Sequence, residues 1–340
     1  MSSPRAASRL IHVDDSLPGI RRERTASGWR YRDAAGKVIR DRAEIERLNA
    51  IALPPAYEDA WFCPAANGHI LATGYDARGR KQYRYHPDFR AAREADKYDR
   101  CAAFGRALPL LRARLESDLR RRSLCADRVV AAVVRLLDLA ALRVGNEQYA
   151  AANKSFGATT LRRRHAKLSG QTLRLSYRAK GGLMREVTIS DRNLATLVRR
   201  LQDLPGQHLF QYRDEGAVCA VGSADVNAYI REAMGTEFSA KHFRTWSASV
   251  EAFAFLYDAP EPPTLKAMVA HVADRLGNTP AVARKAYVHP AMIAAAQDRR
   301  AFAADAGALP RATRYLSRYE RGFLAWLERV PDAAVLLRSA

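Results

Sequence analysis

Four residues that could together break and reseal a phosphodiester follow one another along the chain: Arg143, Lys180, Arg244 and Tyr287. A tyrosine that attacks a phosphodiester needs cations to hold the non-bridging oxygens and an acid to protonate the departing oxygen. Arginine suits the first task, because its guanidinium matches phosphate geometry and stays charged. Lysine suits the second, because its pKa moves when it is desolvated or crowded by cations. The set predicts phosphoryl transfer to Tyr287, with the lysine as general acid.

Each of these residues also has an ordinary structural interpretation when it is taken alone. Arg143 follows an apolar helix, where an arginine commonly offsets the helix dipole. Lys180 lies in R-A-K-G-G, the predicted tip of a hairpin, where lysines are usually solvated. One tyrosine among 14 is more often a half-buried core residue than a nucleophile. The order and the local contexts, including K-H-F-R-T-W at Arg244 and A-R-K-A-Y at Tyr287, favour catalysis.

The composition indicates a polyanionic partner. The chain has 340 residues, a net charge of +20 and a pI near 10.2. A surplus this large is costly for a compact protein unless a polyanion offsets it, so nucleic acid is the first expectation. An anionic membrane surface comes second, but no apolar run approaches the roughly 20 residues of a membrane span. With no secretory signal at the N-terminus, we expect a cytoplasmic protein located at the nucleoid.

Composition also argues against a metal centre. The four cysteines are far apart and form no C-x-x-C pair, and the eight histidines show no ligand spacing. No cluster of carboxylates offers the ligands of a metallonuclease. We therefore expect no metal and no cofactor.

Patterning divides the chain into a tail at 1–20, a small mainly-β domain at 21–87 and a mainly-α domain at 88–340, joined by a short linker near 86–92. The first part shows a hairpin with its turn near Gly36 and a second hairpin turning at Asn67-Gly68. A short helix is expected between them, and the segment R-G-R-K-Q-Y-R-Y-H-P after them alternates basic and aromatic residues, as an exposed strand would.

The second part reads as helices with one β interruption. Leu173 to Ile189 alternate around Gly181-Gly182, which places Lys180 at a hairpin tip. Thr279-Pro280 has the signature of a helix start, so Tyr287 should lie about two turns into a short helix. Helices are expected near 88–121 (with a possible break at Pro109), 125–142, 191–202, 223–233, 240–257, 263–276 and 312–329.

These motifs resemble those of type IB DNA topoisomerases, most closely the compact branch of poxviruses and bacteria. The resemblance runs from L-P-P-A-Y-E-D-A-W near residue 53 to Tyr287. It implies an α+β fold: a small mainly-β N-terminal domain and a larger mainly-α catalytic domain of the topoisomerase IB/tyrosine recombinase type with an inserted β-hairpin. It also implies an isomerase that relaxes supercoiled duplex DNA through a 3′-phosphotyrosyl intermediate, without ATP or metal.

The resemblance implies further site residues. Asn278 stands where poxvirus and eukaryotic members carry a histidine that hydrogen-bonds a non-bridging oxygen; its amide can donate the same bond but cannot add charge. It could equally cap the helix that follows. Lys241 shares a helix face with Arg244, a placement that an intervening phosphate would stabilise. The implied DNA contacts are Lys241, Tyr149, Gln82, Tyr83 and Tyr85.

Two alternatives remain at this stage. A tyrosine recombinase would have a similar catalytic fold and nucleophile, but its second arginine usually lies in an H-x-x-R box. Here Lys241 occupies the first position of that box and His242 is shifted by one. A non-enzymatic DNA-binding protein would explain the charge but not the conjunction of the four catalytic residues. We expect a monomer that closes as a clamp around double-stranded DNA.

Overall fold

The structure is a computed structural model that describes residues 9–26, 28–261 and 263–339. The chain divides into two compact units, Met1–Ala95 and Asp96–Ala340, which are described separately below. Part of the expected tail, residues 1–8, lies outside the described residues. Ile11 beyond it exchanges backbone hydrogen bonds with Asn67 and His69 of unit 1. In the described ranges, no helix combines the length and the apolar character that crossing a membrane requires.

Unit 1 is mainly β, as the sequence predicted. Its five strands form an antiparallel sheet in the order β2-β1-β3-β4-β5, and one helix, α1, packs with it around a small core that includes Tyr31, Leu48 and Phe62. Asp41 caps α1 by accepting a hydrogen bond from Ala43. The elements are β1 Ile20–Thr25, β2 Gly28–Arg32, α1 Arg42–Ala50, β3 Glu58–Phe62, β4 Ile70–Tyr75 and β5 Lys81–Tyr85.

Of the two hairpins predicted in unit 1, the structure confirms one fully and the other only in its turn. The turn at Asn67-Gly68 does join β3 to β4. The turn at Gly36 also exists, but its returning arm meets β2 only in an isolated bridge between Arg32 and Val38. The main partner of β2 is β1, which the pattern did not predict, because its sequence I-R-R-E-R-T has a single fully buried residue.

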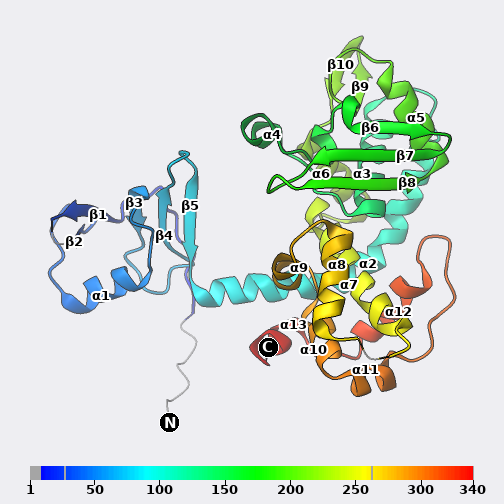
Figure 1. The fold of residues 1–340 in the computed structure, drawn as a ribbon. Helices are drawn as coiled ribbons and strands as arrows, with labels where there is room; N and C mark the ends of the chain where they lie inside the picture. Colours follow the sequence, from blue (N-terminus) through cyan, green and yellow to red (C-terminus); the bar gives the residue numbers. More distant parts are fainter. Residues whose placement is uncertain (1–8, 27, 262, 340) are drawn as a thin grey trace. The chain divides into compact units, whose positions relative to one another are not determined.

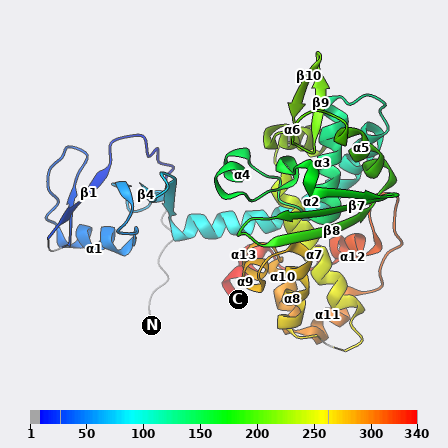
Figure 2. The same cartoon turned by 45° about the horizontal axis from the view of Figure 1, so that its top comes forward.

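Unit 2 is mainly α (Figures 1 and 2). Every predicted helix is present, although the last one is shorter than expected, and α2 continues through Pro109 without a break. Phe104, Leu108 and Leu111 are fully buried on both sides of that proline, and this packing holds the helix together. The helices are α2 Pro87–Leu119, α3 Ala126–Ala140, α4 Glu147–Asn153, α5 Arg192–Gln202, α6 Ser223–Met234, α7 Ala240–Asp258, α8 Leu265–Leu276, α9 Pro280–Ala286, α10 Pro290–Gln297, α11 Arg299–Ala306, α12 Arg318–Leu327 and α13 Ala333–Ser339.

A three-stranded antiparallel sheet, β6-β7-β8, lies against these helices. The expected hairpin is its β7–β8 pair, with Leu173, Leu175 and Tyr177 buried on one face and Lys180 in the turn. The third strand, β6, and a separate pair, β9–β10, were not predicted, because each spans only four residues. The strands are β6 Ala166–Ser169, β7 Thr172–Arg178, β8 Met184–Ser190, β9 Gln211–Asp214 and β10 Ala217–Ala220, and short 3₁₀ turns occupy Ala158–Thr160 and Arg163–His165.

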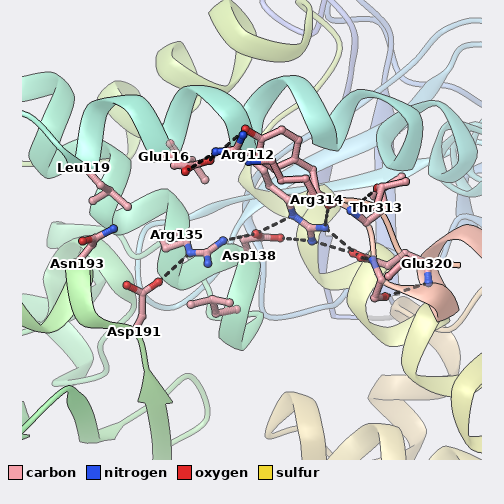
Figure 3. A pocket seen from close by; sticks show the side chains of 16 residues that line it. Arg112, Glu116, Leu119, Arg135, Asp138, Asp191, Asn193, Thr313, Arg314 and Glu320 are labelled. Atoms are coloured by element: carbon pink, nitrogen blue, oxygen red, sulfur yellow. Dashed lines mark hydrogen bonds and ion pairs between the residues drawn. The ribbon is translucent and has the colours of Figure 1, made fainter.

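A buried ionic network ties four segments of unit 2 together (Figure 3). Arg112 on α2 is bidentate to Asp138 on α3 and also bonds both carboxylate oxygens of Glu320 on α12. Arg135 extends the chain of charges from Asp138 to Asp191, the N-cap of α5. These groups line a cavity of about 530 Å³, and the network fixes the helices that frame it.

Candidate active site

Arg143 is positioned by the end of α3 and by a close backbone contact. Ala141 ends α3 in the left-handed conformation, which turns the chain so that Arg143 leaves the helix. The carbonyl oxygen of Arg143 accepts a hydrogen bond from Ala158. A Cβ at Gly157 would lie 2.6 Å from that oxygen and 2.6 Å from the nitrogen of Gly145, so only glycine fits there. Two segments of backbone thus pack directly against each other to hold the arginine.

Asn278 meets Arg143 directly. Gly277 ends α8 with a left-handed φ of +60°, and Asn278 follows it. The Nη2 atom of Arg143 donates to Oδ1 of Asn278 over 2.8 Å. Because a guanidinium only donates, this contact assigns the oxygen of the amide to the arginine side. The buried Nδ2 of Asn278 has no partner among the described atoms, so the amide keeps a donor for an incoming acceptor.

Arg244 is the most buried of the candidate cations, with 4% of its surface exposed. It lies in the second turn of α7, and its guanidinium donates to the carbonyls of Ala141 and Leu276, the ends of α3 and α8. Its buried Nε has no partner among the described atoms. Burial lowers the pKa of Arg244 and the charge of Arg143 lowers it further, as expected for a cation held where an anion should arrive.

Tyr287 lies beside Arg244. It is the residue that ends α9, which begins with the predicted Thr279 cap and Pro280, and its side chain is half-buried. The guanidinium carbon of Arg244 is 4.6 Å from the centre of the Tyr287 ring. Burial alone would raise the pKa of the phenol, but a hydrogen bond from Arg244 and the charges of Arg244, Arg143 and Lys180 outweigh burial and hold that pKa below its ordinary value.

Ser249 on α7 fixes the backbone around Tyr287. Its hydroxyl accepts a hydrogen bond from the amide of His289 over 3.1 Å. The same hydroxyl donates to the carbonyl of Thr245 on its own helix and lies 3.5 Å from the carbonyl oxygen of Tyr287. The segment that carries the phenol is thereby attached to the central helix of unit 2.

Lys180 lies at the exposed tip of the β7–β8 hairpin. It lines a cavity of about 420 Å³ together with Arg143, Tyr149 and the backbone of Gly157. Figures 1 and 2 both show the hairpin tip on the same side of unit 2 as α4, the helix that carries Tyr149. Lys180 and Arg143 thus line the same cavity.

Five of the expected site residues therefore lie near one another in unit 2: Arg143, Lys180, Arg244, Asn278 and Tyr287. The residues expected to contact DNA around them are more widely spread. Tyr149 is half-buried on α4 at the cavity. Lys241 is exposed one turn before the buried Arg244, at the surface end of the same helix. No group of three or more His, Cys, Asp or Glu side chains in the described part of the chain is arranged to hold a metal ion.

The other three expected contacts lie on β5 of unit 1. Tyr83 and Tyr85 are about 40% exposed, and their rings stack in parallel with centres 5.7 Å apart. Gln82 points to the other face of the strand and donates to Asp76 over 3.0 Å. The exposed strand was predicted correctly, and its two tyrosines present one aromatic surface.

The sequence did not single out two residues that the structure places at the site. Ser249 gave no signal, because a serine inside a helix is common. Arg185 on β8 gave no signal either, because a polar residue is expected at every second position of a half-buried strand. Its guanidinium nevertheless reaches the end of α8. Arg178, two residues before Lys180, is the last residue of β7, and its guanidinium lies against Gly182.

Known proteins match this chain over most of its length. Residues 86–304 match the family model described as "Eukaryotic DNA topoisomerase I, catalytic core", and residues 28–76 match "Bacterial DNA topoisomerase IB, N-terminal domain". The DNA topoisomerase 1B of Acanthamoeba polyphaga mimivirus is 31% identical over 287 residues, which cover 80% of this chain and 85% of that protein.

A solved structure, the XerH site-specific recombinase bound to palindromic difH substrate in a post-cleavage complex, is also similar. It is 18% identical and covers 53% of this chain and 47% of its own, with a TM-score of 0.35.

Proposed function

This chain belongs to the type IB DNA topoisomerase family, and from that premise we propose how its own residues carry out the reaction. The chain is an isomerase that relaxes supercoiled duplex DNA by cutting one strand transiently and resealing it. The bond energy of the cut phosphodiester is kept in a phosphotyrosyl bond, so resealing needs no ATP. The residues assigned to this chemistry are Tyr287, Arg143, Lys180, Arg244 and Asn278.

In the cleavage step, the half-buried phenol of Tyr287 gives its proton to solvent water, and its oxygen attacks the scissile phosphorus. The bond from phosphorus to the 5′ oxygen breaks, and Lys180 gives a proton to that oxygen. The products are a 3′-phosphotyrosyl bond and a free 5′-hydroxyl. Torsion then turns the free end about the intact strand, and the 5′-hydroxyl attacks the phosphotyrosyl bond in the reverse reaction to restore the DNA.

The single observation that carries this proposal is the contact of Arg244 with Tyr287. The arginine is buried and 4.6 Å from the ring centre, and cationic neighbours keep the pKa of the phenol below its ordinary value. A phosphate that contacts the guanidinium of Arg244 would therefore lie close to the side chain of Tyr287. Preorganised donors of this kind stabilise charge that develops in a transition state.

Arg143 and Asn278 supply the remaining donors. Their mutual hydrogen bond fixes the Asn278 amide with its NH₂ group available to a non-bridging oxygen. This donor is neutral, so it contributes a hydrogen bond and takes no part in proton transfer. Lys180 is the group left to serve as the acid, because it is exposed at a turn whose neighbouring glycines allow it to approach bound DNA.

Duplex DNA is the partner of the reaction, and we propose that its contacts extend beyond the catalytic group. Lys241 and Tyr149 of unit 2 are assigned to the phosphate backbone, and Gln82, Tyr83 and Tyr85 of unit 1 to base edges and backbone. With a net charge of +20, affinity should fall steeply with salt. We further propose that the protein acts as a monomer, closes around the duplex as a clamp, and works at the nucleoid in the cytoplasm.

Relaxation of a supercoiled plasmid without ATP and in the presence of EDTA tests the proposal. Wild type should relax the plasmid, and Tyr287→Phe should bind DNA with similar affinity yet leave it supercoiled. Denaturant added during the reaction should trap wild type on the 3′ end of the cut strand. Relaxation by Tyr287→Phe would overturn the assignment of the nucleophile.

The acid has its own test. A 5′-bridging sulfur leaves without protonation, so Lys180→Ala should cleave an ordinary substrate slowly but a sulfur-containing substrate at close to the wild-type rate. General acid–base catalysis commonly contributes about 10²–10⁴-fold, which sets the expected loss on the ordinary substrate. An unrestored rate on the sulfur substrate would assign the acid to another residue.

A further inference from the structure

The strand that follows the Lys180 turn is fastened to the helix end that precedes Asn278. Arg185 lies on β8, just past the turn. Its Nη1 donates to the carbonyl oxygen of Asp274 over 3.2 Å, and its Nη2 to that of Arg275 over 2.6 Å. Both carbonyls belong to the last turn of α8, where few intrahelical donors remain; the carbonyl of Asp274 also accepts a hydrogen bond from the amide of Gly277. One side chain thus satisfies two carbonyls of a different element.

The fit at this contact leaves no room for another side chain. Gly277, which ends α8, has a left-handed φ of +60°. A Cβ built on it would lie 2.5 Å from Nη1 of Arg185 and 2.8 Å from its Cδ. The arginine therefore occupies the space in which a side chain at position 277 would lie. This packing is independent of the two hydrogen bonds, and it holds Arg185 against the residue directly before Asn278.

Arg185 occupies a site that is costly for a cation. Burial lowers its pKa, and the charges of Arg275 and Arg143 lower it further, whereas Tyr177 and Asp274 oppose the shift. Oriented carbonyls at the negative end of α8 compensate a guanidinium in such a place. An arginine in a solvated surface position would make none of these contacts. We therefore interpret Arg185 as a residue that joins β8 to α8.

We propose that Arg185 is a positioning residue for Lys180: it fastens the turn end of the β7–β8 hairpin to the end of α8, so that Lys180 and Asn278 are held at fixed positions relative to each other. The inference rests on the general-acid role proposed above for Lys180. Without this attachment, the turn at Gly181 and Gly182 would remain formed, but its distance from the arginines would vary. Misplacement of a reacting group by about 1 Å costs on the order of 10²-fold in rate.

The test is single-turnover cleavage of two matched duplexes, one with an ordinary scissile phosphate and one with a 5′-bridging sulfur. Arg185→Ala should cleave the ordinary duplex on the order of 10²-fold more slowly than wild type. The sulfur duplex should recover most of that loss, because it needs no acid. Arg185→Lys, which keeps one donor group for the carbonyls, should lie between wild type and Arg185→Ala.

Two further variants separate positioning from general damage to the fold. Gly277→Ala displaces the guanidinium from the other side of the contact, and it should show the same selective recovery with sulfur. Arg174→Ala removes an exposed arginine from the neighbouring strand β7 and should cleave both duplexes at the wild-type rate. Thermal melting of each variant shows whether it is folded; if Arg185→Ala is unfolded, Arg185→Lys and Gly277→Ala carry the test.

The outcomes distinguish this inference from the function on which it rests. Equal slowing of both duplexes by Arg185→Ala, or no slowing, would overturn the positioning role while Lys180→Ala is still rescued by sulfur. Failure of sulfur to rescue Lys180→Ala would overturn the acid assignment and the positioning role together. Selective rescue of Lys180→Ala, Arg185→Ala and Gly277→Ala would support both.

Discussion

The guanidinium of Arg244 lies against the ring of Tyr287, with its carbon 4.6 Å from the ring centre. Arg244 is buried and Tyr287 is half-buried, and each favours the charged form of the other. The arginine supplies charge where the phenolate would form, and the phenolate would offset the cost of burying the arginine. The pair is therefore a preformed element of the site, assembled before DNA is bound.

This contact predicts how cleavage depends on pH. Burial raises the pKa of Tyr287, but Arg244, Arg143 and Lys180 lower it below its ordinary value, so the ascending limb of the cleavage rate should lie below pH 10. Arg244→Gln removes the cation that lowers the pKa of Tyr287 most, so the ascending limb of the pH–rate profile should move to higher pH and the maximal rate should fall. Single-turnover cleavage across a pH series, at saturating enzyme, measures both effects. An unmoved limb would show that Tyr287 ionisation does not govern the rate.

Asn278 is expected to act only as a hydrogen-bond donor. Asn278→Ala should slow cleavage by about 10²–10³-fold, the usual loss for one donor to a transition-state oxygen. Asn278→His keeps a donor and should retain more activity, whereas Asn278→Asp offers only acceptors and should be the slowest of the three. Asn193→Ala, an exposed asparagine on α5, serves as the control and should cleave normally. Equal rates for the alanine and histidine variants would contradict the donor role.

The close backbone contact beneath Arg143 should also be essential. Gly157 has an extended backbone that any residue adopts, so Gly157→Ala tests space alone. Its Cβ would meet backbone atoms of Arg143 and Gly145, which cannot rotate away. We expect cleavage to fall on the order of 10²-fold with DNA affinity little changed. Gly222→Ala is a matched control, because its nearest contact is 3.5 Å and its φ is ordinary; an equal loss in both variants would contradict this prediction.

The ionic network of Figure 3 should contribute to stability more than to catalysis. Arg112→Ala leaves the buried carboxylates of Asp138 and Glu320 without their main cation, and removing one partner of a buried pair costs about 3–5 kcal/mol. Burial would raise the pKa of Glu320, but Arg112 lowers it below its ordinary value. The stabilisation is therefore present above the carboxylate's unfolded pKa and is lost as pH falls through its folded pKa.

Urea unfolding at neutral and at acid pH measures this contribution. The difference in unfolding free energy between Arg112→Ala and wild type should be large at neutral pH and should shrink on acidification. Arg120→Ala, whose exposed ion pair with Glu116 should contribute about 0–1 kcal/mol, is the comparison. A difference that is independent of pH would assign the stabilisation to packing of the arginine side chain.

The sequence predicted those parts of the site whose local pattern is strong. Asn278, Thr279 and Pro280 mark the end of one helix and the start of the next, so the place of Tyr287 in the fold could be derived from caps. Lys180 followed from the alternation on either side of two glycines. The helices were predictable because apolar residues recur with helical spacing over many turns, as in α3.

Contacts between distant elements could not be derived in the same way. Nothing near Arg185 indicates that its guanidinium ends on carbonyls of α8, because that pairing depends on how the sheet packs against the helices. The partner of β2 was missed for a related reason: β1 is mostly polar, and pairing between strands leaves no mark on the composition of either one. The close approach of Gly157 to Arg143 likewise exists only in the folded chain.

The attachment of the Tyr287 segment to Ser249 has a mechanical consequence. Once a DNA strand is joined to the phenol, torque stored in the supercoils pulls on the backbone of residues 287–289. The hydroxyl of Ser249 on α7 hydrogen-bonds this short segment, which continues directly into α10. The pulling force is therefore transmitted to the core of unit 2. The DNA end bound to Tyr287 therefore stays in place while the free 5′ end rotates about the intact strand. Because the tyrosine does not move, the 5′-hydroxyl finds the phosphotyrosyl bond at the same position after each rotation.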